Sequence, residues 1–144
     1  MGEGNKEGVH LEPEEALTAY LMATPAVTAL IGDRWFPMLI PQDAIRPAAA
    51  FQRIPGTQRV MAHDGPVGFA SCTIQITAQA ERYADAKTVL RAIRLAVDGY
   101  RGLMGGLQVH RAAVSGDGDG WAEQLSMPTL RMDIDVSWEE VSSY

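Results

Sequence analysis

The most chemically suggestive stretch of the sequence is SGDGDGW, residues 115–121, in which one glycine separates two aspartates. Such a stretch can begin a calcium-binding loop, form a phosphate-binding turn or connect two strands. An EF-hand loop starting at Asp117 would use Asp119 as its next ligand, but it would need glutamate where Pro128 stands. The Gly-Lys-Ser/Thr ending of a phosphate-binding loop is also absent. The sequence therefore predicts a flexible polar loop between antiparallel strands, with no metal and no cofactor.

The single cysteine, Cys72, is a second candidate for chemistry, because a thiolate can act as a nucleophile. Activation would require a histidine and an orienting group to converge on it, and no spacing in the sequence indicates this. Cys72 alternates with polar residues in step with Ile74 and Ile76, which is the pattern of a strand with one buried face. We therefore predict that Cys72 is a small core residue. The sequence predicts no catalytic residues.

The three histidines stand far apart, and none has a second ligand at helical or turn spacing: His10, His63 and His110. A zinc site is therefore not expected. His63 is followed by Asp64. The pair could be a general base with its orienting carboxylate, or it could be part of an ordinary turn. Adjacent residues in a turn ending Gly-Pro rarely orient one another, so the pair predicts a turn.

The segment Trp35, Phe36 and Pro37 opens a stretch rich in proline, RWFPMLIPQDAIRP. Proline lacks the backbone donor that a central strand needs, so this stretch predicts an edge segment followed by an extended loop. The two aromatic rings either pack locally or contact another subunit, and the sequence leaves both alternatives open.

The composition and the net charge limit the class of protein to which this chain can belong. The chain has 144 residues, 47% of them hydrophobic, which suits one domain with a single core. The net charge of -6 disfavours sequence-specific binding to DNA or RNA, because acidic surfaces repel phosphates. A lone cysteine forms no internal disulfide, and no signal peptide or membrane span is expected. We expect a chain that is cytosolic when made.

The patterning predicts an α+β fold, with helices on one face of a mainly antiparallel sheet. Residues 1–12 are expected to form a flexible arm and residues 13–144 a single domain. The expected elements run in this order: a helix from Pro13, a short helix between Thr24 and Gly32, a hairpin turning at Pro55-Gly56, a strand over 71–79, a long helix over 82–102, a strand over 107–114 and a last strand over 129–140. The apolar stripe of the long helix is expected to include Tyr83 and Tyr100.

The order of these motifs resembles a known family. The segments that carry the resemblance are TPAVTALIGDRWFP, IPQDAIRPAAAFQRI, CTIQITAQAERYADAKTVLRAIRLAV and LRMDIDVSWEE, within residues 13–139. They resemble the tail-completion or tail-terminator proteins of long-tailed phages, prophages and gene transfer agents. The hairpin end TQRVMAHDGPVG departs from the family pattern, so no contact is carried over to it.

The resemblance implies a structural virion protein of the tail or neck, assembled in the host cytoplasm. Such proteins form a ring, usually of six subunits, that ends the tail tube and joins it to a head-side connector or stopper protein, with DNA passing through. Neither catalysis nor a cofactor is implied. The alternatives are another neck component, such as a head-completion or stopper protein, a small cytosolic enzyme or ligand-binding domain, and a free monomeric interaction module. Burial of Trp35 within its own chain would favour the monomeric module.

A closed ring needs two different complementary patches on each subunit. The candidates for subunit or partner contact are the Trp35, Phe36 and Pro37 edge, the N-terminal arm, the loop at His63 and Asp64, and residues 115–121. An acidic lining would keep DNA from adhering to the ring. The candidates for that lining are Asp117 and Asp119 in the predicted loop and Asp133, Asp135 and Glu139 on the polar face of the last strand.

Overall fold

The structure, a computed structural model, describes residues 12–61, 67–122 and 127–141. Within these residues the fold is α+β, with one six-stranded sheet in the order β1-β2-β3-β6-β5-β4. The strands are β1 (Trp35–Pro37), β2 (Ala48–Met61), β3 (Val67–Gln79), β4 (Tyr100–Met104), β5 (Leu107–Ala122) and β6 (Met127–Val141). Only β1 pairs in parallel, with β2, and every other pairing is antiparallel. The predicted fold class is confirmed.

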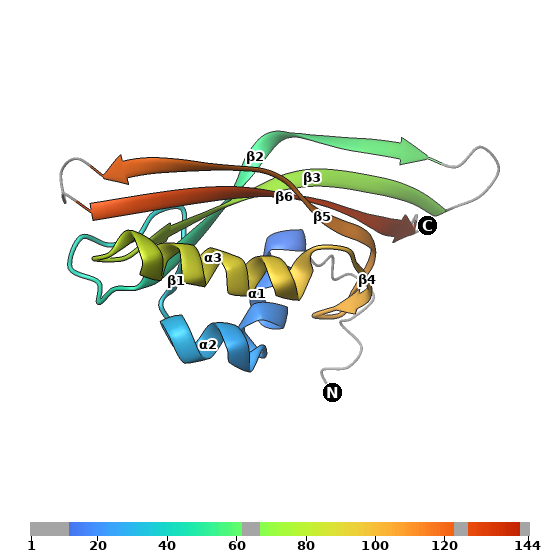
Figure 1. Ribbon diagram of the computed structural model, residues 1–144. Coiled ribbons are helices and arrows are strands. Elements are labelled where there is room, and N and C mark those ends of the chain that lie inside the picture. Colours follow the sequence, from blue (N-terminus) through green and yellow to red (C-terminus); the bar gives the residue numbers. More distant parts are fainter. Residues whose placement is uncertain (1–11, 62–66, 123–126, 142–144) are drawn as a thin grey trace.

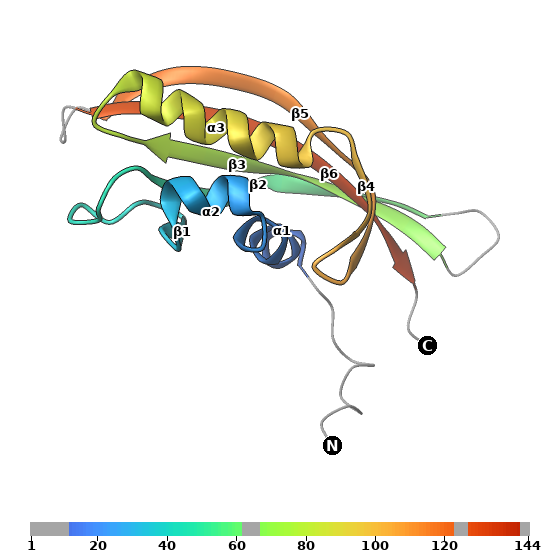
Figure 2. The ribbon, with the colours of Figure 1, turned by 60° about the horizontal axis from the view of Figure 1, so that its bottom comes forward.

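The helices are α1 (Pro13–Met22), α2 (Pro25–Ile31) and α3 (Tyr83–Val97). Figures 1 and 2 show all three on the same side of the sheet, which leaves the opposite face without helical cover. We call this uncovered side the open face. The predicted arrangement of helices on one side of an antiparallel sheet therefore agrees with the structure.

The first helix begins where the sequence predicts it. Pro13 occupies the first helical turn, where its missing N–H breaks no hydrogen bond. The backbone N–H of Glu12 donates to the Glu15 carboxylate at 3.2 Å, so the helix starts with a capping box. Its apolar side, which includes Leu17 and Leu21, is buried against the sheet.

The predicted long helix is shorter than expected. The helix ends at Val97. Tyr100 fits the helical spacing but lies in β4 instead. Gly99 has φ +82°, a conformation that ends a helix and that residues with a Cβ adopt at a cost. Tyr100 packs on Tyr20, with ring centroids 4.8 Å apart. Tyr83 is exposed and does not belong to the buried stripe.

The predicted turn at Pro55-Gly56 is also wrong, because β2 continues through both residues. The pairing of β2 with β3 shifts register between Ile54 and Gln58, so the extra residues form a bulge within a strand. Since β1 pairs only as far as Phe51, Pro55 lies where β2 has become an edge, and its missing donor is tolerated there. The connection to β3 falls in 62–66, outside the described residues.

The main core fills the space between the sheet and the helices. Cys72, Ile74 and Ile76 are buried in it, as the alternation in their strand predicts. A second, smaller apolar cluster lies on the open face, where Ile40 packs with Ala48 and Ala50. The segment between β1 and β2 thus returns over the open face and covers the start of β2.

Candidate functional surfaces

The stretch SGDGDGW is strand and not loop, which corrects the prediction. Asp117 pairs with Met132 and Asp119 with Leu130, both within the β5–β6 ladder. The glycines between the aspartates favour a flexible loop. However, β6 pairs with this part of β5, so the stretch forms a strand. The loop that joins β5 to β6 lies in 123–126, outside the described residues.

Asp133 and Asp135 of β6 lie on the open face. Thr73 Oγ1 donates to Asp135 Oδ1 at 2.8 Å, and Gln75 Nε2 donates to Asp133 Oδ1 at 3.5 Å. These bonds join β3 to β6 across the face. Glu139 is exposed nearer the end of the same strand.

The five acidic candidates come from two strands, Asp117 and Asp119 from β5 and the other three from β6. Asp117 and Asp119 pair with core residues of β6, whereas Asp133 pairs with Gly116. The open face is also not uniformly acidic, because exposed Arg131 lies two residues before Asp133 on the same side of β6. The face is a polar surface of mixed charge with an acidic excess on one strand.

The aromatic edge divides into a buried and a surface part. Trp35 is only 8% exposed, and its Nε1 donates to Thr18 Oγ1 at 2.8 Å. Its ring stacks on the ring of Phe51, with the two centroids 5.1 Å apart. The ring of Trp35 therefore packs within its own chain. Phe36 is half-buried and Pro37 is exposed, so these two residues are what the edge presents at the surface.

The extended loop after this edge was predicted, but its side chains were not named as a contact. Three large apolar side chains protrude from it: Met38, 66% exposed, Leu39, 69%, and Ile45, 71%. The available signal was the apolar run Met38–Ile40 between two prolines, which reads equally well as the end of a strand. The other predicted contact, His63 and Asp64, lies outside the described residues.

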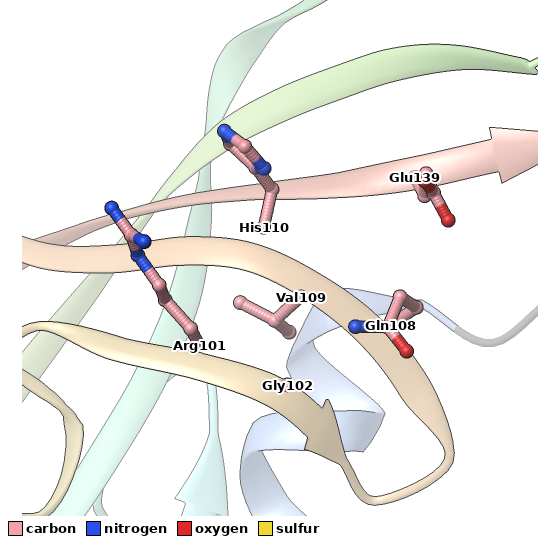
Figure 3. Close-up of a pocket in the computed structure, with 6 residues that line it drawn as sticks. All are labelled: Arg101, Gly102, Gln108, Val109, His110 and Glu139. Carbon is pink, nitrogen blue, oxygen red and sulfur yellow. The ribbon is translucent and has the colours of Figure 1, made fainter.

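A hollow of about 350 Å³ lies where β4, β5 and β6 meet (Figure 3). Six residues line it: Arg101, Gly102, Gln108, Val109, His110 and Glu139. Gly102 has no side chain to fill the space, and a Cβ there would meet nothing within 4 Å. The sequence did not reveal this site, because its residues come from three strands that only the fold brings together.

The environment of Cys72 does not activate its thiol. Burial raises the pKa of Cys72 to about 11, although the Arg53 guanidinium beside it acts in the opposite direction. Arg53 itself bonds to Glu12 at 2.6 Å and to Glu14 at 2.7 Å. A thiol with a raised pKa stays protonated near neutral pH, which is the opposite of what a nucleophile requires.

The described residues contain neither a metal-binding cluster nor a helix suited to span a membrane. Among residues 12–61, 67–122 and 127–141, no group of three or more His, Cys, Asp and Glu side chains is placed to hold a metal ion. Across the same ranges, no helix is both long and apolar enough to cross a membrane.

The described residues have an α+β fold whose prominent features are an open polar face, an exposed apolar loop and a hollow at the opposite edge. Exposed apolar side chains that cluster on a surface are typical of proteins that bind other proteins. The family model of the tail completion protein gp17 matches residues 15–137. The chain belongs to this family, and its role is that of a structural component of a phage tail.

A solved structure has the same fold. A chain from the virion of a native gene transfer agent particle superposes with a TM-score of 0.67 at 16% sequence identity, covering 89% of this chain and 95% of that one. No curated protein sequence matches this chain. The predicted family is thus confirmed, and with it a place in the tail or neck of a virion.

Proposed function

We propose that this protein forms a ring, usually of six subunits in the family it resembles, that ends the tail tube and joins it to the head-side connector. The observation that supports this role most strongly is the match of the tail completion family over residues 15–137. The similarity to a gene transfer agent chain, over nearly its whole length, supports the same architecture. The ring is assembled in the host cytoplasm, and no catalysis or cofactor is needed for it.

The open face is the part of the molecule best suited to line a passage for DNA. Its carboxylates Asp133 and Asp135 are held by hydrogen bonds from β3, and Glu139 continues the row. A carboxylate row repels a phosphate backbone, so DNA would slide past without sequence-specific binding. Replacing Asp133 and Asp135 with asparagine should reduce DNA delivery, while the same change at Asp117 and Asp119 tests whether β5 contributes.

Tail tubes purified without this protein provide the direct test of the role. A terminator should appear as a cap at one end of each tube and should stop further addition of tube subunits. Electron microscopy of negatively stained tubes, before and after addition of the protein, measures both effects. Binding to isolated head connectors with no binding to tubes would instead support the alternative of a stopper or head-completion protein.

A further inference from the structure

One outer side of β5 is only partly covered by the neighbouring strand. β4 pairs with β5 over residues 107–112, and the carboxylate of Asp98 accepts the backbone N–H of Val114 at 2.9 Å. Residues 116–122 pair with β6 in unbroken register, and within the described part of the chain no strand pairs with their outer side. We call residues 116–122 the β5 edge. An unpaired strand edge offers backbone N–H and C=O groups to which another strand can be added.

A second free edge lies on the other side of the sheet. β1 pairs with β2 only as far as Phe51, where the backbone N–H of Met38 donates to the Phe51 carbonyl at 2.8 Å. The bulge between Ile54 and Gln58 contains Pro55, which has no N–H to donate, so regular pairing with a further strand stops there. Residues 58–61 lie beyond the bulge and, among the described residues, pair only with β3. We call residues 58–61 the β2 edge.

The two edges have the directions and positions that join identical copies head to tail. Every pairing from β2 through β3 and β6 to β5 is antiparallel, so β2 and β5 run in opposite directions. Figure 1 shows the ends of β2 and β5 at opposite ends of the molecule, with β3 and β6 between the two strands, so one copy cannot pair its own edges. The stagger between neighbouring copies is what a closed sheet requires, because its strands are tilted against the axis.

The charges of the two edges are complementary. Asp117 and Asp119 lie opposite Met132 and Leu130 of β6, and Arg59 of the β2 edge lies opposite Ala70 of β3. These three partners all belong to the core between the sheet and the helices. Residues opposite one another share a side of the sheet, so the register places both aspartates and the arginine on the helical side. Pairing between two β5 edges would instead bring the aspartates of two copies together.

We infer that the β5 edge of one copy pairs antiparallel with the β2 edge of the next, so that the sheets of neighbouring copies join edge to edge. Two different edges on every copy produce a head-to-tail contact, which closes into a ring when the rotation allows. The inference rests on the proposed ring and names the contact that builds it. It also places the open faces of all copies on one side of the joined sheet, where Asp133 and Asp135 would form a continuous lining.

Two single-cysteine variants test the contact: Gly118→Cys in the β5 edge and Val60→Cys in the β2 edge, each combined with Cys72→Ala. They are mixed under conditions that give rings, with tail tubes added if the protein alone stays monomeric, and treated with a short bismaleimide. A linked dimer is expected only in the mixture. A mixture of Gly118→Cys with Leu103→Cys, at an exposed position of β4, is the control and should stay unlinked. Linkage in Gly118→Cys alone, or equal linkage to Leu103→Cys, would overturn the inference.

A charge swap adds an independent readout. Arg59→Asp should reduce the fraction of chains in rings about tenfold, because it places like charges together at every contact of the ring. Adding Asp117→Arg and Asp119→Arg to this variant should restore rings. Arg111→Asp removes the same charge at an exposed position in the part of β5 that β4 covers, and it should leave the fraction unchanged.

Circular dichroism spectra matching the unmodified chain would show that these variants fold. Rings that form normally with Arg59→Asp and show no linkage between the two edges would overturn the edge contact and leave the ring intact. Absence of any ring from the unmodified chain, with tail tubes present, would contradict the proposed function as well.

Discussion

The backbone of Gly105, in the turn between β4 and β5, lies directly against the carbonyl oxygen of Ala16 in α1. A Cβ built on Gly105 would be 2.7 Å from that oxygen, and the residue has φ +56°. This close approach ties the β4–β5 turn, and with it the β4 edge of the sheet, to the first helix. The edge is therefore a fixed part of the domain.

Gly105→Ala should lower the free energy of unfolding by about 1–3 kcal/mol, because it adds a backbone clash to the cost of a left-handed conformation. Gly99→Ala is the matched control, since Gly99 also has a positive φ but has nothing within 4 Å of a Cβ. Denaturant unfolding of both variants measures the difference. Equal losses would show that Ala16 does not restrict the turn.

The polar contact of Trp35 is expected to stabilise the folded chain by itself. Thr18→Val keeps the volume of the side chain but removes the acceptor of the Trp35 Nε1 proton, and this should cost about 1–3 kcal/mol. Thr88→Val is the control, because the Thr88 hydroxyl bonds only to the carbonyl one turn back on an exposed helix surface. A loss at Thr18 no larger than at Thr88 would show that the hydrogen bond from Trp35 Nε1 adds no stability.

The centre of the sheet should be the most sensitive part of the core. Ile74→Ala removes a fully buried side chain between sheet and helices, and the expected loss is about 2–5 kcal/mol in unfolding free energy. Leu95→Ala, at an exposed position, should change stability by about 0.5 kcal/mol or less. Thermal and urea unfolding of the two variants provide the comparison.

The raised pKa of Cys72 predicts a pH dependence with a definite sign. The folded thiol has a pKa of about 11 against an ordinary value of 9.0, so its stabilising contribution is complete below pH 9 and is lost as pH rises toward 11. Cys72→Ala should therefore lose less stability than the unmodified chain over that interval. Urea unfolding at pH 8, 9 and 10 measures the difference. A parallel decline in both proteins would show that the thiol titrates alike in folded and unfolded chains.

The fold could be predicted from the sequence where one periodicity dominated. Alternation around Ile74 and the proline start of α1 correctly located a strand and a helix. The errors came from residues whose local preference was overruled. Pro55 and Gly56 favour a turn but lie in a strand that continues past them as a bulged edge. Tyr100 fits the helical stripe, yet Gly99 ends the helix before it.

The candidate surfaces were harder to predict than the fold. The acidic row on β6 follows directly from alternation, so Asp133 and Asp135 lie where the pattern places them. The hollow where β4, β5 and β6 meet depends on residues from three strands, and no sequence spacing reveals such a site. Trp35 is buried within its own chain, which agrees with the alternative that its ring packs locally. This burial is also what a monomeric interaction module would show. The loop that follows Trp35 nonetheless exposes Met38, Leu39 and Ile45 at the surface.

The central claim is that this chain works as a ring. The most direct test is its mass in solution, measured by analytical ultracentrifugation across a wide concentration range, alone and after addition and release of tail tubes. We expect a closed oligomer of one fixed size, or a monomer that converts to it on tubes. A protein that stays monomeric in every condition and leaves tubes uncapped would contradict the claim.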